Sequence, residues 1–429
     1  MKIKRFALSL ILILTPLVLL FAKGQPESGV AQQGAPVQLT IAGRDGVYGD
    51  AMQYATDAYT KLHPNVTFQV LKLPYDSQYQ KVVIDMKSGT GTYDLIMIDD
   101  PNAPQFMKAG WLASLDQQLS QRGEKLDPDL ISAAVRVGRY PYSDSGTLYA
   151  LPHVGNVEMF AFRKDLIAKY GLAVPKTWTD VLADAKALKA DDPSVTPIIF
   201  RGVKGNPIVS GFLPILWAFG GEVLNGDTAA VDSPQALAAL NFFLSLKPYA
   251  PQGVDTWNAA QVRDALYSGS AAIATEVWPS WVGDLENPDK SKVVGKVTVA
   301  APPSQTSQSA AVIGAWLLGI PKDSHYVSSA FDFLMYVTGK EMQTQLADQF
   351  GIAPSRKSVL EDPQLQKKFP WFPGQEQALE NGRARARTSH WPEIETTFGT
   401  YLQLALIGQM SAQDALKTAN DKIQAIVSQ

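Results

Sequence analysis

The chain has 429 residues, more than one ordinary hydrophobic core accommodates, so two domains are expected. Its net charge of −3 gives no electrostatic reason to expect a nucleic-acid partner. It contains no cysteine, which excludes disulfides, thiolate metal sites, cysteine nucleophiles and acylation of an N-terminal cysteine.

The first residues have the pattern of a secretory signal. The basic start MKIKR is followed by the apolar run FALSLILILTPLVLLFA and by the polar exit KGQPESG. The alternative is a membrane anchor, but the run is short for a spanning helix and contains Pro16. We therefore predict export, with residues 1–22 as a signal peptide cleaved near Ala22. Residues 23–36, rich in Gly, Gln, Ser and Pro, are predicted to form a flexible leader.

Strand and helix patterns alternate in the segment that follows. Apolar and β-branched runs predict strands, and apolar residues at helical spacing predict helices between them. The strands are predicted at residues 38–42, 66–71 and 95–98, and the helices at 50–62 and around 79–86. This order predicts βαβ units and a parallel sheet. Because strand 95–98 is apolar throughout, we expect helices on both faces of that sheet.

Alternating strand and helix patterns also occur later in the chain. Helices are expected to begin after Thr177 and after Ser233, where a capping residue precedes an apolar run. Further strands are predicted within residues 151–162 and at 197–200, 271–274, 297–300 and 314–320. The last quarter of the chain has mainly helical patterns.

Charged side chains follow two of the predicted strands. Arg44 and Asp45 come after the first strand, and Asp99 and Asp100 come after the third. Ligands of open α/β sheets bind in the crevice beyond the carboxyl ends of the strands, so these residues are candidate ligand contacts. The structural alternatives are turn chemistry around the glycines that flank Arg44 and Asp45, and a helix cap made by Asp100 or Asn102.

Several segments, through their order and spacing, carry a resemblance to a known family. They read YDLIMIDDPNAPQFMKAGWLASLD, LYALPHVGNVEMFAFRKDLIAKYGLAVPKTWTDVLADAKAL, AFGGEVL, GSAAIATEVWPSWVG, GAWLLGIPKDSHYVSSAFDFLMYVTGKE and GIAPSRKSVLEDP. Together they resemble the family 1 extracellular solute-binding proteins, the sugar-capturing subunits of ABC importers. The resemblance implies an α/β, two-lobed periplasmic binding protein fold of type II. Each lobe is then a mostly parallel sheet flanked by helices, with the ligand cleft between lobes that close by hinge motion.

The resemblance also implies a domain organisation and a function. Residues 37–153 and 305–337 are predicted to form the N-lobe, and residues 154–304 and 338–429 the C-lobe. The function implied is that of a periplasmic, monomeric binding protein that captures a carbohydrate or polyol and delivers it to the permease subunits of an ABC importer. No cofactor, metal or nucleic acid is expected.

Sugar recognition combines two kinds of side chain. Hydroxyls pair with planar hydrogen-bonding groups, and the apolar faces of sugars pack on flat aromatic rings. The predicted ligand-binding residues are Arg44, Asp45, Tyr48, Asp99, Asp100, Asn102, Asn156, Glu276, Trp278, Gly314, Trp316, Arg385, Arg387 and Trp391.

Several of these assignments depend on matched positions in the family. Trp278 matches a sugar-stacking aromatic residue of the maltose-binding relative, and Gly314 lies in a segment whose backbone approaches the ligand. Asn156 stands where relatives carry a ligand-contacting acid or polar group, and an asparagine there suggests a different ligand. The segment 205–210 reads GNPIVS and lacks the acid and the tyrosine of the maltose binder, which argues against maltodextrin.

Other candidates have a structural alternative. Arg385, Arg387 and Trp391 belong to GRARARTSHWPEIE, which matches a linker that often reaches the cleft but which also reads as a solvated charged segment. His153 is a weaker candidate, because a single histidine is more often structural. Trp281 is expected to pack in the core.

Two other functions use similar residues. A secreted carbohydrate-active enzyme also needs carboxylates and aromatic rings, but adjacent side chains such as Asp99 and Asp100 diverge and cannot flank one bond. The sequence also lacks the nucleophile-elbow, zinc-protease, P-loop and dinucleotide-binding fingerprints. A ligand-loaded partner of a chemoreceptor or sensor kinase would share the same site. We therefore predict a binding protein without catalytic activity.

Overall fold

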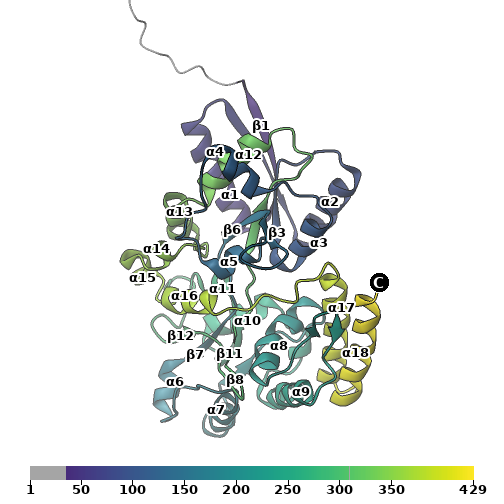
Figure 1. Ribbon diagram of the computed structural model, residues 1–429. Helices are drawn as coiled ribbons and strands as arrows, with labels where there is room; N and C mark the ends of the chain where they lie inside the picture. The colour runs from purple at the N-terminus through teal and green to yellow at the C-terminus, as the bar shows by residue number, and fades with distance from the viewer. Residues whose placement is uncertain (1–34, 309) are drawn as a thin grey trace, which may run out of the picture. The chain divides into compact units, whose positions relative to one another are not determined.

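Two larger β-sheets organise the chain from Pro36 to Gln429 (Figure 1). The computed structural model describes residues 35–308 and 310–429. The predicted signal peptide and residues 23–34 of the predicted leader lie outside the described residues. Within the described ranges, no helix has the length and the apolar character needed to cross a membrane.

The first sheet has five strands in the order β2-β1-β3-β13-β6. They are β1 (Val37–Arg44), β2 (Val66–Leu73), β3 (Leu95–Asp99), β6 (Ala150–Val154) and β13 (Trp316–Gly319). Strand β1 runs parallel to β2 and β3, whereas β13 runs antiparallel to β3 and to β6. The sheet is mixed, because β2, β1, β3 and β6 run in one direction and β13 runs in the other. The reason is that β13 is supplied by a segment returning from the second sheet, and not by a local βα crossover.

Helices cover both faces of the first sheet, as the apolar strand predicted. Leu95 and Met97 of β3 pack with one group of helices, and Ile96 and Ile98 pack with the other, since successive side chains point to opposite faces. The first group is α1 (Val47–Leu62), α12 (Val327–Val337) and α13 (Lys340–Phe350), and the second is α2 (Tyr75–Ser88) and α3 (Ala103–Lys108).

The second sheet has the order β12-β7-β11-β8. Its strands are β7 (Met159–Arg163), β8 (Thr196–Ile199), β11 (Ala271–Val277) and β12 (Val297–Ala300). Strand β11 is parallel to β8 but antiparallel to β7, which is antiparallel to β12 as well. Strands β8, β11 and β12 therefore run in one direction and β7 in the other, so the predicted α/β class, with most strands of each sheet parallel and helices on both faces, is confirmed.

Helices enclose both faces of the second sheet (Figure 1). One face packs against α7 (Trp178–Asp191), α8 (Asn206–Ala218), α9 (Pro234–Leu246), α17 (Trp391–Leu406) and α18 (Ala412–Val427). The other packs against α10 (Ala259–Ser268), α14 (Lys357–Leu360), α15 (Pro363–Lys368) and α16 (Phe372–Glu380). The shorter elements are α4 (Leu115–Arg122), α5 (Ser132–Arg136), α6 (Lys164–Lys169), α11 (Pro279–Val282), β4 (Arg139–Tyr140), β5 (Thr147–Leu148), β9 (Leu224–Asn225), β10 (Thr228–Ala229), η1 (Asp100–Asn102), η2 (Lys247–Tyr249) and η3 (Val254–Thr256).

The predicted helix starts are confirmed where a capping side chain marks them. Thr177 and Asp180 form a capping box at the start of α7: the side chain of each residue accepts a hydrogen bond from the backbone N–H of the other. Ser233 accepts a hydrogen bond from the backbone N–H of Ala236 at the start of α9.

The chain passes between the two sheets along neighbouring segments. Val157, between β6 and β7, pairs with Ile313 of the returning segment, and Val312 pairs with Arg383 further along the chain. The hydrophobic core of the first sheet also includes Met342 and Leu346 of α13. The lobe boundaries remain a prediction, and this core extends beyond the expected end of the N-lobe at residue 337.

Candidate ligand-binding site

A cavity of about 620 Å³ is lined by residues from both sheets and their helices. Of the residues predicted from the sequence, those lining the cavity are Arg44, Tyr48, Asp99, Asn156, Trp278, Gly314, Trp316 and Arg385. The structure places Asp45, Asp100, Asn102, Glu276, Arg387 and Trp391 outside this lining.

Aromatic side chains of the first sheet and of helices α1 and α2 form one part of the wall. The ring of Trp316 on β13 lies 5.9 Å from the rings of Tyr48 and Tyr75. The guanidinium of Arg44 stacks over Tyr75 at 5.2 Å and over Trp316 at 5.5 Å. Arg44 also pairs with Asp45 at 2.9 Å, so Asp45 neutralises a cation of the wall from outside the cavity.

Trp278 and Gly314 fit against each other in the wall. Trp278 follows β11 and precedes α11. A Cβ at Gly314 would lie 2.4 Å from Cζ3 of Trp278, so only a glycine admits the indole in this position. Trp281, which the sequence suggested was core packing, also lines the cavity, 6.4 Å from Trp278 and 4.9 Å from the guanidinium of Arg201.

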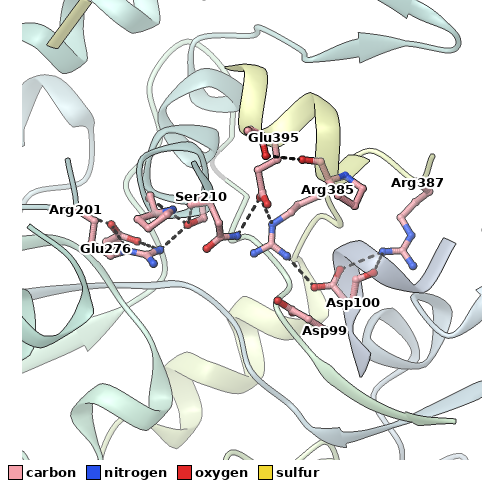
Figure 2. Close-up of polar contacts among 12 residues, drawn as sticks. Asp99, Asp100, Arg201, Ser210, Glu276, Arg385, Arg387 and Glu395 are labelled. Carbon is pink, nitrogen blue, oxygen red and sulfur yellow. Dashed lines mark hydrogen bonds and ion pairs between the residues drawn. The ribbon is translucent and has the colours of Figure 1, made fainter. Parts of the chain in front are cut away.

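Glu276 holds an arginine of the wall and does not reach the cavity itself. Its side chain is completely buried and forms a two-point ion pair with Arg201, at 2.9 Å and 2.7 Å (Figure 2). Both carboxylate oxygens are therefore occupied by the same guanidinium, which is the geometry that arginine favours. Arg201 lines the cavity in place of the predicted acid.

Asp99 and Asp100 have different surroundings. Asp99 lines the cavity, and its Oδ2 accepts a hydrogen bond from the Tyr75 hydroxyl at 2.7 Å. Burial raises the pKa of Asp99, although the nearby Arg385 and the Tyr75 hydroxyl oppose this. Asp100 is fully buried and accepts hydrogen bonds from Arg385 and Arg387 (Figure 2). Neither Asp99 before η1 nor Asn102 before α3 makes a side-chain cap.

Two further candidates lie in the protein interior. Trp391 is completely buried in the hydrophobic core at the start of α17. His153 is also completely buried, and burial lowers its pKa to about 4, so the imidazole is neutral at pH near 7. These surroundings agree with the structural alternative for His153, whereas Trp391 is neither in the cavity lining nor part of a solvated segment.

Several lining residues were not predicted from the sequence. They are Tyr75, Arg201, Val203, Lys204, Asn206, Pro207, Asn258, Ala259, Ser280 and Trp281. Applied to every element, the strand-end rule would have found Arg201, which follows β8. Asn206 begins α8 and Asn258 caps α10, so helix starts were a second available signal.

Four polar atoms of the lining residues are buried without a hydrogen-bond partner among the described residues. They are the acceptor Oδ1 of Asn156 and the donors Nε1 of Trp278, Nε of Arg44 and Nε of Arg385. Buried polar atoms in folded proteins are normally paired, and an orphan in a cavity wall is available to a bound molecule.

Comparison with known proteins gives the family. The profile of the bacterial extracellular solute-binding proteins matches residues 45–344. A mannitol-binding protein of Pseudomonas aeruginosa is 28% identical over 417 residues, which cover 90% of this chain and 92% of that protein. A solute-binding protein of Agrobacterium radiobacter K84, solved with ribitol, has a TM-score of 0.81 and 24% identity, over 91% of this chain and 99% of its own. Maltose-bound T. maritima MalE3 has a TM-score of 0.79 and 25% identity, over 91% of this chain and 99% of its own.

The chain therefore belongs to the bacterial extracellular solute-binding protein family. This confirms the resemblance drawn from the dispersed sequence segments. It also confirms the class of protein, because this is a family of binding proteins of ABC transporters and not of enzymes.

Proposed function

We propose that the protein captures a sugar or polyol in the cavity and delivers it to the permease of an ABC importer. The observation that carries this proposal is that one cavity wall contains both aromatic rings and two buried polar atoms without a hydrogen-bond partner, Asn156 Oδ1 and Trp278 Nε1. A hydroxyl group both donates and accepts hydrogen bonds, so it can satisfy either atom. The rings of Trp278, Trp281 and Trp316 offer flat surfaces to the C–H groups of such a ligand.

The charges of the wall favour a neutral ligand. Arg44 pairs with Asp45, Arg201 with Glu276, and Arg385 with Asp100. These arginines keep N–H groups for hydrogen bonding, and each already has a carboxylate beside it. Lys204 is the lining cation for which the described residues supply no ion pair. A polyhydroxylated molecule needs such donors without needing a counter-charge.

The relatives support the choice between polyol and sugar. The Pseudomonas relative is named for mannitol, and the Agrobacterium structure contains ribitol. The T. maritima structure contains maltose, but the segment at Asn206 and Pro207 lacks the acid and tyrosine expected of a maltodextrin binder. We place mannitol and ribitol first and maltose second.

A thermal-shift panel tests this function. Mannitol, ribitol, glucose and maltose are added separately, with glycine and glutamate as non-sugar controls. A ligand that binds only the folded state stabilises it by RT ln(1 + [L]/Kd), or about 2.7 kcal/mol at a hundredfold excess over Kd. We expect at least one polyol or sugar to raise Tm and to change tryptophan fluorescence. A response to the amino acids alone, or hydrolysis of a glycoside, would overturn the proposal.

The replacement Trp278→Ala gives the panel a matched variant. It removes one aromatic face and one donor, so the ligand-induced Tm shift should largely disappear. Because Trp278 also belongs to the core, the variant's Tm without ligand is measured first. Thr177→Ala, which removes a helix cap far from the cavity lining, lowers stability by about 1 kcal/mol and should keep the full ligand response.

We further propose that the protein works in the periplasm as a monomer. The predicted signal peptide and membership of an extracellular family support export. Cell fractionation tests the location, and co-purification with a membrane permease tests the partner. Recovery of the protein only from the cytoplasm would contradict this part of the proposal.

A further inference from the structure

We propose that Arg387 and Asp100 form a positioning relay behind the cavity wall, in which Arg387 holds Asp100 and Asp100 holds Arg385 against the ligand. The proposal rests on the proposed function, because it assumes that the ligand lies in the cavity that Arg385 lines. Asp100 and Arg387 do not line the cavity themselves, and the lining side chain that Asp100 contacts directly is Arg385.

The buried carboxylate of Asp100 is divided between two arginines. Its Oδ1 accepts a hydrogen bond from Nη1 of Arg385 at 3.0 Å, and its Oδ2 accepts one from Nη1 of Arg387 at 3.1 Å. Arg387 is itself fixed by the backbone carbonyls of Asp100 at 2.8 Å and Val137 at 2.6 Å. Figure 2 shows the two arginines approaching Asp100 from opposite sides.

Arg385 depends on Asp100 for its orientation. Its Nε has no hydrogen-bond partner in the described part of the chain and lies 3.7 Å from Oε1 of Glu395, which is too long for a hydrogen bond. Glu395 is already engaged by the amide of Asn206 at 3.0 Å. Asp100 therefore supplies the direct side-chain hydrogen bond that fixes the guanidinium.

The relay joins elements that cover different sheets. Asp100 begins η1 after β3, whereas Arg385 and Arg387 lie between α16 and α17. From the sequence, the alternating GRARAR segment was interpreted either as part of the site or as a solvated linker. In the structure, two of its arginines bind Asp100. Arg383, the first arginine of this segment, instead forms an ion pair with the half-exposed Glu222 at 2.9 Å and lies outside the cavity lining. Arg383 is thus a matched control within the same segment.

The charges around Asp100 make the relay sensitive to pH. Burial raises the pKa of Asp100 to about 7; Arg385 and Arg387 oppose the rise, while Asp99 and Glu395 add to it. The ionised carboxylate binds a guanidinium more strongly than the neutral acid does. Removing the cation of Arg387 should raise the pKa of Asp100 further, so more of Asp100 would be neutral at a given pH.

The affinity experiment compares Arg387→Met with Arg383→Met. The probe is mannitol, or maltose if mannitol gives no thermal shift. We expect wild-type affinity to increase as pH rises through about 7, because ionised Asp100 then fixes Arg385. In Arg387→Met the affinity should fall by about tenfold, as for one lost charged hydrogen bond, and its rise should move to higher pH. Arg387→Lys should restore part of the affinity, and Arg383→Met should behave like the wild type.

A ligand-free experiment separates the relay from the proposed function. Because the folded-state pKa of Asp100 lies above the unfolded value, stability from this group is lost as pH rises through the folded pKa. The loss is larger without Arg387, so the Tm gap between wild type and Arg387→Met should widen from about pH 6 to about pH 9. A constant gap overturns the relay, whether or not a sugar binds. If Arg387→Met does not fold, Arg387→Lys decides: wild-type affinity and an unchanged pH profile overturn the proposal.

Discussion

At the scale of single residues, buried acids in this protein differ in whether they have a partner. Glu276 is buried in a two-point ion pair with Arg201. Glu158 is equally buried, but neither of its carboxyl oxygens has a partner within residues 35–308 and 310–429. Burial and the neighbouring Glu276 raise the pKa of Glu158 well above its ordinary value, and Arg201 and Arg385 compensate only in part. The folded protein therefore holds the proton of Glu158 to a higher pH than the unfolded chain does.

This protonation state predicts how stability depends on pH. Unfolded Glu158 ionises near pH 4.3, whereas the folded protein keeps the proton to much higher pH. Its favourable contribution is complete below the unfolded pKa and is lost as pH rises, by up to about 1.4 kcal/mol per pH unit. Glu158→Gln cannot ionise, so its free energy of unfolding should rise relative to that of the wild type as pH increases from about 5 upward.

Urea unfolding across this pH range measures the difference. Glu361→Gln, at an exposed position, is the control and should show a nearly constant difference from the wild type. A constant difference for Glu158→Gln as well would mean that Glu158 is charged in the folded protein.

At the scale of elements, features set by neighbouring residues were predicted from the sequence, whereas features set by contacts distant in the chain were not. The capping box of Thr177 and the apolar strand at residues 95–98 were readable because their partners are neighbours in sequence or are implied by continuous burial. The antiparallel direction of β13 could not be predicted, because this strand pairs with β3 and β6 from far along the chain. The direction of Asp100 was hidden for the same reason, since the remote Arg385 and Arg387 hold it.

Contact between two elements also predicts the effect of a single methyl group. In Gly314→Ala the new Cβ would lie 2.4 Å from Cζ3 of Trp278, so the indole that follows β11 must move. We expect affinity for the panel ligand to fall by about tenfold, with altered tryptophan fluorescence. In the control Gly283→Ala the nearest atom, a carbonyl oxygen of Pro279, lies at 3.8 Å, an ordinary contact, and affinity should be kept. Unchanged affinity in Gly314→Ala would show that this face of Trp278 does not contact the ligand.

At the scale of the whole molecule, the two sheets have separate cores but share one cavity. The first sheet contributes Trp316 and Asp99 to the wall, and the second contributes Arg201 and the adjoining Trp278. The chain links them through narrow segments such as the pairing of Val157 with Ile313. Links of this kind allow two bodies to rotate as units about a few residues, which is how hinge closure proceeds.

Closure should therefore accompany binding, and small-angle X-ray scattering can measure it. A ligand that touches both walls binds the closed arrangement better and shifts the population toward it. We expect the radius of gyration to fall when the panel ligand is added at saturation. Trp278→Ala, which loses a contact in one wall, should show little change at the same ligand concentration. If the thermal shift proves binding while the radius of gyration stays constant, the ligand is held without closure, and the two walls must already stand at their binding distance in the free protein.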